Sequence, residues 1–270
     1  MRSTLFSIPV PEFLQGFLPS SIPIFGYGLM ILLAYLTVTS LCVFRAKKYN
    51  IDKEIVQDLT LSILLAGIIG ARIAHIALYS HQYESFVEIF KIWNGGLVLY
   101  GFLLTAPLMI WYKLKKHNIS WDTFFAIFLP PVPLGIGIGR LGCFLNGCCY
   151  GKPGEASWCV TFPAKVFPQS FLDAHGHVPI HPTQLYAFFL GLILSVLLMK
   201  LPTILTQMKG REIFTCFLLG YGIIRLLEES FRADTPNHFF NSLTAGQGIS
   251  VLMIVASIIY FIISSKNQKV

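Results

Sequence analysis

Apolar runs recur along the whole chain, separated by short polar segments. Seven of them are close to the roughly 20 residues that a helix needs to cross a bilayer. They cover Phe25 to Phe44, Val56 to Tyr79, Leu97 to Tyr112, Thr123 to Ile138, Gln184 to Met199, Ile213 to Leu227 and Gly246 to Ile263. The pattern predicts an all-α, multi-pass membrane protein, with about seven transmembrane helices in a single integral membrane domain over residues 1–270. The composition agrees, because 54% of the residues are hydrophobic and only 12% are charged.

Lysine and arginine residues gather in alternate loops. Twelve of the twenty follow the first and third runs, separate the fifth from the sixth, or close the chain. Because cytoplasmic loops carry an excess of Lys and Arg, the C-terminus is predicted to be cytoplasmic. The N-terminus and the segments 80–94, 146–183 and 229–245 are predicted to lie outside. The net charge of +7 therefore needs no nucleic-acid partner.

The longest polar segment, residues 146–181, lies on the predicted outer side. It is too long for a bare turn, so we expect a small external cap with some structure of its own.

Three arginines lie in or at the end of apolar runs: Arg72, Arg140 and Arg225. One such charge at the bilayer centre costs about 2.5–3.5 kcal/mol on insertion scales, so three together indicate an anionic partner at membrane depth. The guanidinium of Arg140, which follows a run of spaced glycines, would suit a phosphodiester. The alternative for Arg140 is a side chain that extends to the lipid phosphates at the interface.

A second charged cluster ends the sixth run, in the sequence GYGIIRLLEESFR at 220–232. Tyr221, Arg225 and Glu229 recur at four-residue steps and so share one face of a helix. The functional interpretation has Arg225 bind an anion, Glu229 orient Arg225, and Tyr221 donate to an ester or phosphate oxygen. In the structural alternative, Glu229 simply neutralises Arg225.

Further polar residues are predicted to line one outward-facing cavity. Arg72 and His75 share a face of the second run, although a lone membrane histidine is more often structural. His181 and Gln184 begin the fifth helix in the sequence HPTQLY, and Gln247 has a similar place at the start of the seventh.

Four of the six cysteines cluster on the predicted outer side: Cys143, Cys148, Cys149 and Cys159. Disulfides or buried thiols fit this pattern best, and thiol redox chemistry is an alternative. The spacing matches none of the strong metal-ligand patterns, so no metal is predicted.

Taken together, the motifs of the chain resemble those of the prolipoprotein diacylglyceryl transferase family, in a cysteine-rich variant. In the family's order they are FGYGLM (25–30), GARIAH (70–75), GGLVLYG (95–101), GRLGCFLNGCCYG (139–151), HPTQLY (181–186), GYGIIRLLEESFR (220–232) and GQGIS (246–250).

The resemblance implies a seven-helix enzyme of the bacterial cytoplasmic (inner) membrane. It would transfer the diacylglyceryl group of phosphatidylglycerol to the lipobox cysteine of a prolipoprotein and release glycerol 1-phosphate. Its partners would be phosphatidylglycerol, the prolipoprotein signal peptide and membrane lipids, with no cofactor and no nucleic acid, and the protein would be a monomer. A membrane thiol oxidoreductase and a transporter of an anionic solute are the alternatives.

The resemblance also assigns residues. Arg140 and Arg225 match the two arginines that hold the headgroup and act in the reaction, and Tyr27, Tyr221, Glu229 and Gly151 fall on motif positions. Where the better-known form has a histidine proposed as the base, this chain has Tyr100. A phenol with a pKa of about 10 is a poor base at neutral pH, so Tyr100 is expected to donate a hydrogen bond unless an arginine lowers its pKa.

Other positions depart from the pattern of the family. Cys143 and Cys148 stand where Asn and Glu are frequent, Ala187 replaces a usual glutamate, and the segment 102–107 lacks further glycines. These departures affect the assignment of the base more than that of the headgroup site.

Overall fold

The computed structural model describes residues 4–9, 11, 21–83, 88–89, 96, 98–204, 208–234 and 243–267. These residues do not include much of the predicted outer segments 80–94 and 229–245. They also do not include the first glycine of GGLVLYG. The chain divides into two compact units. Unit 1 comprises Met1–Val38 and Phe128–Val270, and unit 2 comprises Thr39–Ile127.

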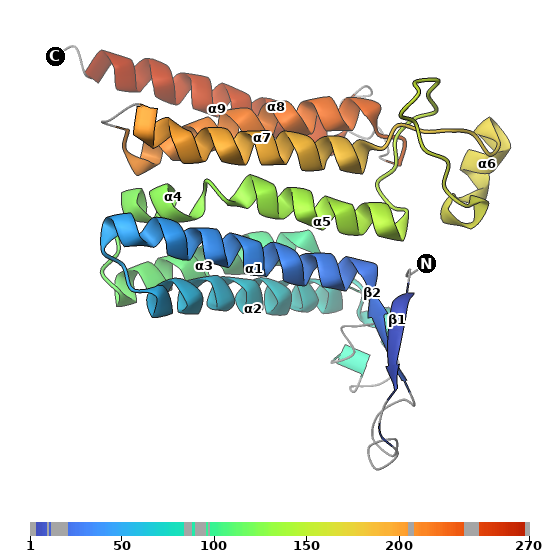
Figure 1. Cartoon of the computed structure of the whole chain (residues 1–270), viewed down its shortest axis with the longest axis horizontal. Helices are drawn as coiled ribbons and strands as arrows, with labels where there is room; N and C mark the ends of the chain where they lie inside the picture. The colour runs from blue at the N-terminus through green and yellow to red at the C-terminus, as the bar shows by residue number, and fades with distance from the viewer. Residues whose placement is uncertain are drawn as a thin grey trace. The chain divides into compact units, whose positions relative to one another are not determined.

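The described residues are mainly helical (Figure 1). The helices are α1 (Gly26–Ala46), α2 (Lys53–Leu78), α3 (Leu99–Lys116), α4 (Trp121–Phe128), α5 (Val132–Asn146), α6 (Gln169–His175), α7 (Thr183–Ile204), α8 (Gly210–Phe231) and α9 (Ala245–Asn267). Each of the seven predicted spans lies on one of these helices, except that the fourth falls on the α4–α5 pair. Pro130 and Pro131 separate α4 from α5, as expected for a residue type that lacks a backbone N–H.

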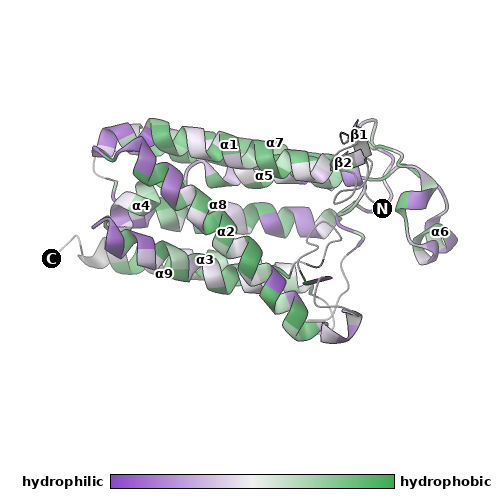
Figure 2. Cartoon of the chain, turned by 90° about the horizontal axis from the view of Figure 1, so that it is seen from below, coloured by the Kyte–Doolittle hydropathy of each residue, from purple (hydrophilic) through white to green (hydrophobic). Residues whose placement is uncertain are grey.

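Four of the described helices, α1, α2, α7 and α9, are long and apolar enough to cross a membrane, and the α4–α5 pair adds a fifth if it counts as one span. The helices are hydrophobic along most of their length (Figure 2). Helix α8 has sufficient length but carries five charged residues, three of them in its last seven positions. The chain is therefore a helical membrane protein, while the count of seven spans remains a prediction.

An antiparallel pair of strands precedes α1, and the all-α prediction omitted it. Strand β1 (Thr4–Pro9) pairs with β2 (Ser21–Phe25), which runs directly into α1. Strands this short give little signal in sequence, because their stability comes from contacts between the two strands and not from either segment alone.

In unit 2, α2 and α3 pack with their backbones in close contact. A Cβ on Gly101 would meet the backbone of Gly70 and lie 2.8 Å from the Cα of Ala71. The hydroxyl of Thr105 donates to the carbonyl of Ala66 across the same interface, at 2.7 Å. Small residues at such contacts let membrane helices approach closely.

Replacement of Gly101 by alanine is expected to separate α2 from α3 and to destabilise the protein by about 1–3 kcal/mol, because the added methyl group meets backbone that cannot rotate away. Thermal unfolding in detergent measures this effect as a lower midpoint. Gly28→Ala is the control, since nothing lies within 4 Å of a Cβ at Gly28. Equal midpoints for the two variants would show that this contact is not tight.

In unit 1, the segment 147–182 connects α5 to α7 and has a small core of its own. Tyr150, Phe167, Phe171 and Ile180 form that core, and the rings of Phe167 and Phe171 stack with centroids 4.8 Å apart. In Figure 1 this segment, with α6, extends beyond the ends of α5 and α7. The segment is also tied to the end of α8, because Lys152 N donates to Phe231 O and Ala233 N donates to Tyr150 O. The expected internal structure is thus present, and the external position of the segment remains a prediction.

Candidate active site

A network of buried ion pairs joins the last turns of α5 and α8 in unit 1. Arg140 Nη2 lies 2.9 Å from Glu228 Oε1, and Arg225 Nη1 lies 2.7 Å from Glu228 Oε2. Arg225 Nη2 also lies 2.8 Å from Glu229 Oε2. Glu228 and Glu229 are only 3% and 4% exposed. One carboxylate, that of Glu228, therefore bridges two arginines from different helices.

The register of α8 explains this arrangement. Glu228 and Glu229 follow Arg225 by three and four residues, and side chains at both spacings lie beside one another on a helix. The sequence interpretation followed the four-residue steps and named Glu229, but it missed Glu228. The three-residue spacing to Arg225 was the available signal, whereas the contact with Arg140 depends on the packing of α5 in unit 1.

Glu229 is held from the start of α9 as well. The hydroxyl of Thr244 donates to Glu229 Oε1 at 3.0 Å, and Arg232 Nη1 lies 3.6 Å from Glu229 Oε2. Gln247 Oε1 accepts from Thr244 N at 3.0 Å, and Gln247 N donates to Thr244 Oγ1 at 3.1 Å. This reciprocal pair is a capping box at the N-terminus of α9. Gln247 therefore acts on Glu229 through Thr244, and its predicted contact with substrate remains a prediction.

Arg232, just beyond α8, adds a third cation beside Glu229. Its Nε and Nη2 atoms donate to the carboxylate of Asp234 at 2.9 and 3.1 Å. Burial alone would lower the pKa of Arg232, but the hydrogen bonds and charge of Asp234, with the charge of Glu229, raise this pKa above its ordinary value. Arg232 is accordingly a permanent cation.

Two tyrosines lie within electrostatic range of this network. Tyr27, in the first turn of α1, is within range of Arg140 and is 46% exposed. Its ring packs beside Gly142, where a Cβ would lie 3.1 Å from Tyr27 Cδ2. Tyr221 is within range of Arg140, Arg225 and Glu228, and its ring stacks on Phe217 with centroids 5.6 Å apart. Two phenol groups are thus placed near the arginines.

The HPTQLY motif holds the turn that follows α5. Thr183 Oγ1 donates to Cys149 O, and Gln184 Nε2 donates to Cys148 O, each at 2.7 Å. Both side chains are fully buried. Nδ1 of His181 lies 2.9 Å from the hydroxyl of Tyr186, which also accepts from Trp158 Nε1 at 2.8 Å. In the described residues, Gln184 and His181 therefore bind protein groups beside the site. Their contacts with substrate remain predictions.

Gly151 lies where the segment 147–182 passes close to the start of α7. Gly151 N donates to His181 O at 3.1 Å, and Gly151 also pairs with Arg232 in a β-bridge. A Cβ at Gly151 would meet His181 O and lie 2.8 Å from His181 Cβ. The absence of a side chain therefore permits this approach.

Gly151→Ala is expected to shift the segment 147–182 away from His181 and to destabilise the protein by about 1–3 kcal/mol. A melting curve of the purified protein measures this change. Gly139→Ala is the matched control, because its Cβ would meet only Ile31 Cδ1 at 3.7 Å, an ordinary contact. An unchanged melting curve for Gly151→Ala would contradict the tight approach.

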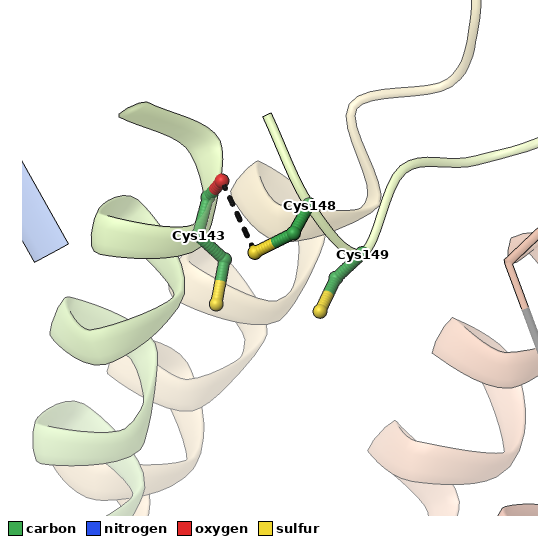
Figure 3. A group of neighbouring side chains, drawn as sticks. All are labelled: Cys143, Cys148 and Cys149. Atoms are coloured by element: carbon green, nitrogen blue, oxygen red, sulfur yellow. Dashed lines mark hydrogen bonds between the residues drawn. The ribbon is translucent and has the colours of Figure 1, made fainter. Parts of the chain in front are cut away.

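Three cysteines bring their sulfur atoms together beside the network (Figure 3). Cys143 lies in the last turn of α5, and Cys148 and Cys149 follow the turn at Gly147. The three Sγ atoms lie within 4.8 Å of one another. Gly147 adopts a left-handed conformation with φ of 72°, which turns the chain back so that Cys148 N donates to Cys143 O at 3.1 Å. All six cysteines of the chain are free thiols.

The remaining predicted residues, Arg72 and Tyr100, belong to unit 2. Arg72 is 8% exposed and donates to the backbone carbonyls of Glu88, Ile89 and Gly96 at 2.7–3.1 Å. These bonds give Arg72 a structural role in its own unit. Tyr100 is 69% exposed in the first turn of α3. The roles of Arg72 and Tyr100 toward the substrate remain predictions.

The ion-pair network can bind an anion. A guanidinium has five N–H donors, and the ion pair with Glu228 engages one nitrogen atom of Arg140, so the same side chain has donors for a second partner. Bidentate donation to a phosphate oxygen pair is a common geometry for arginine. The site therefore combines partly paired cations with two nearby phenols, in a setting from which water is largely excluded.

Comparisons with known proteins find similarity over most of the chain. A family model described as prolipoprotein diacylglyceryl transferase matches residues 17–263. The chain is similar to the phosphatidylglycerol–prolipoprotein diacylglyceryl transferase of Bordetella avium, with 32% identity over 252 residues that cover 90% of each chain. It is 30% identical over 240 residues to the protein of that name from Clostridium tetani, covering 88% of this chain and 92% of the relative. The corresponding protein of Buchnera aphidicola from Acyrthosiphon pisum is 33% identical over 255 residues, covering 86% and 89%.

Proposed function

We infer the activity of this protein from the premise that the chain belongs to the prolipoprotein diacylglyceryl transferase family. It transfers the diacylglyceryl group of phosphatidylglycerol to the thiol of the lipobox cysteine in a prolipoprotein. The observation that carries this proposal is the network in which Glu228 bridges Arg140 and Arg225. The network supplies two oriented cations for one phosphodiester.

In the proposed site, Arg140 and Arg225 bind the phosphate of the headgroup. Negative charge grows on that phosphate as its bond to carbon breaks, and fixed cations in a site with little water stabilise this charge more than water does. Glu228 and Glu229 hold the two guanidinium groups in place, so little reorganisation is needed during the reaction. Tyr27 and Tyr221 donate hydrogen bonds to ester or phosphate oxygens.

The chemical step is a displacement at the glycerol carbon of the diacylglyceryl group that carries the phosphate. The thiolate sulfur of the lipobox cysteine forms a thioether bond to this carbon, and the carbon–oxygen bond to the phosphate breaks. The electron pair leaves with the phosphate, which departs as glycerol 1-phosphate. The thiol must lose its proton before or during this step, because the thiolate is the nucleophile.

The other predicted residues complete this proposal. Gly151, His181, Gln184 and Gln247 shape the substrate site through the backbone and the cap of α9, and Arg72 is a supporting charge. Tyr100 stands where the better-known form of the family has its proposed base, a histidine. In this chain Tyr100 donates a hydrogen bond. In this proposal seven helices cross the bacterial inner membrane, with the N-terminus and the segment 147–182 outside and the C-terminus in the cytoplasm, and the protein works as a monomer.

The test is incubation of the purified protein with phosphatidylglycerol vesicles and a lipobox peptide, followed by mass spectrometry of the peptide. The expected product carries one diacylglyceryl group, joined by a thioether. A peptide with serine in place of the lipobox cysteine is the control and should remain unmodified. An unmodified cysteine peptide, with folded protein and intact lipid, would overturn the proposed function.

A further inference from the structure

The three thiols of Cys143, Cys148 and Cys149, which we call the thiol cluster, have no role in the mechanism above. Their Sγ atoms lie within 4.8 Å of one another in unit 1 (Figure 3). Cys148 and Cys149 are on the turn that the HPTQLY motif holds, and Cys143 is in the last turn of α5. Cys143 is 9% exposed, and the other two are partly exposed. The cluster is thus partly accessible.

We propose that the thiol cluster binds one Zn²⁺ ion and that the lipobox cysteine of the substrate becomes the fourth ligand of this ion. The inference rests on the proposed function and deepens it, because it names the group that activates the nucleophile. It also replaces the expectation of a metal-free enzyme, which came from the spacing of the cysteines in sequence.

The geometry of the thiol cluster suits a tetrahedral ion. Zinc–sulfur bonds of about 2.3 Å in a tetrahedron separate the sulfur atoms by about 3.8 Å. The three thiols, now within 4.8 Å, would converge by up to about 1 Å, which rotation of the side chains can supply. Thiolates are soft ligands that select zinc among common divalent ions. Zinc sites with three protein ligands characteristically leave the fourth position to water or substrate.

The surroundings of the thiol cluster also suit a metal. Thr183 and Gln184 donate to the carbonyls of Cys149 and Cys148, so the backbone that carries two ligands is fixed. Such supporting contacts orient the ligands at metal sites. Three thiolates and one Zn²⁺ ion leave a net charge of −1. Arg140 and Arg232 both lie within electrostatic range of Cys149 and can balance that charge.

The zinc site supplies a means to ionise the substrate thiol. The chain otherwise lacks one, because Tyr100 replaces the histidine proposed as the base. A thiol that binds Zn²⁺ loses its proton, because the cation stabilises the thiolate strongly. The proton leaves to water as the sulfur–zinc bond forms. The zinc-bound thiolate then attacks the glycerol carbon, the new thioether leaves the ion, and glycerol 1-phosphate takes the electron pair of the broken carbon–oxygen bond. No electron transfer is involved, in keeping with the lack of redox chemistry at zinc.

The first test is the metal content of the protein purified without chelators, measured by plasma mass spectrometry. We expect about one zinc per chain in the wild type and in Cys216→Ser, and only background zinc in Cys148→Ser. Cys216 is the control because it lies in α8, away from the thiol cluster. Background zinc in the wild type, even after incubation with Zn²⁺, would overturn the inference.

The second test needs no variant and reports on the substrate directly. Cobalt(II) replaces zinc in the wild-type protein, and its thiolate-to-metal absorption is recorded as the lipobox peptide is added. The cysteine peptide should intensify this band as a fourth cobalt–sulfur bond forms, whereas the serine peptide should leave it unchanged. An identical response to both peptides would overturn the substrate's place on the metal.

A third measurement separates the inference from the proposed function. At pH 6.5 a free thiol with a pKa of about 8.5 is only about 1% ionised, so removal of zinc is expected to slow diacylglyceryl transfer by up to about 100-fold. Full transfer activity in metal-free protein would overturn the inference and leave the proposed function standing. If zinc-loaded protein forms no thioether, the proposed function is overturned. The role of the ion in activating the substrate is then overturned as well.

Discussion

Replacement of Arg140 by lysine is expected to lower kcat/KM for diacylglyceryl transfer by about 100- to 1000-fold, the usual effect of removing one oriented donor from a site where charge develops. Lysine keeps the positive charge but loses the planar fork of donors, so it cannot hold Glu228 and a phosphate together in the same geometry. The measurement is the initial rate of thioether formation at several concentrations of phosphatidylglycerol. The folded fraction, from gel filtration in detergent, should match that of the wild type.

The control for this variant is Arg211→Lys, an exposed position at the opposite end of α8 from the network. It tests whether loss of any guanidinium impairs the enzyme, and it should keep the wild-type rate within about twofold. Equal rates for Arg140→Lys and the wild type would remove Arg140 from the proposed headgroup site.

Replacement of Glu228 by glutamine is expected to destabilise the protein by about 3–5 kcal/mol, as is typical when one partner of a buried ion pair is removed. The neutral amide leaves the charges of Arg140 and Arg225 without their shared carboxylate, although its shape is nearly the same. Thermal unfolding in detergent and the yield of monodisperse protein both report this loss. Transfer activity should fall with it, because the two arginines no longer have a common anchor.

Glu155→Gln is the matched control, since Glu155 is exposed in the segment 147–182. Its stability should stay within about 0.5 kcal/mol of the wild type, as is usual for surface substitutions. A Glu228→Gln protein as stable and active as the control would show that the bridge between α5 and α8 is dispensable.

Long apolar segments made most of the fold predictable. The predicted span Phe25 to Phe44 corresponds to α1 (Gly26–Ala46), because hydrophobic length alone marks such a helix. The prediction for α8 stopped at Leu227, four residues short of its end at Phe231, since Glu228 and Glu229 interrupt the apolar run. Strands β1 and β2 were not predicted, because each is short and is stabilised by its pairing with the other.

The residues of the candidate site were predictable in part. Spacing along α8 identified the pair of Arg225 and Glu229, but the link from Glu228 to Arg140 arises only where α5 and α8 pack together. The spacing of the cysteines predicted no metal. The turn at Gly147 brings Cys148 back beside Cys143, which no count of intervening residues reveals.

The most direct test of the account measures the release of the headgroup from phosphatidylglycerol labelled in its terminal glycerol. The protein is incubated with this lipid and either the cysteine or the serine lipobox peptide, and glycerol 1-phosphate and thioether product are both quantified. Equal molar amounts of the two products are expected with the cysteine peptide, and neither product is expected with the serine peptide. Release of glycerol 1-phosphate with the serine peptide, or none with the cysteine peptide, would contradict it.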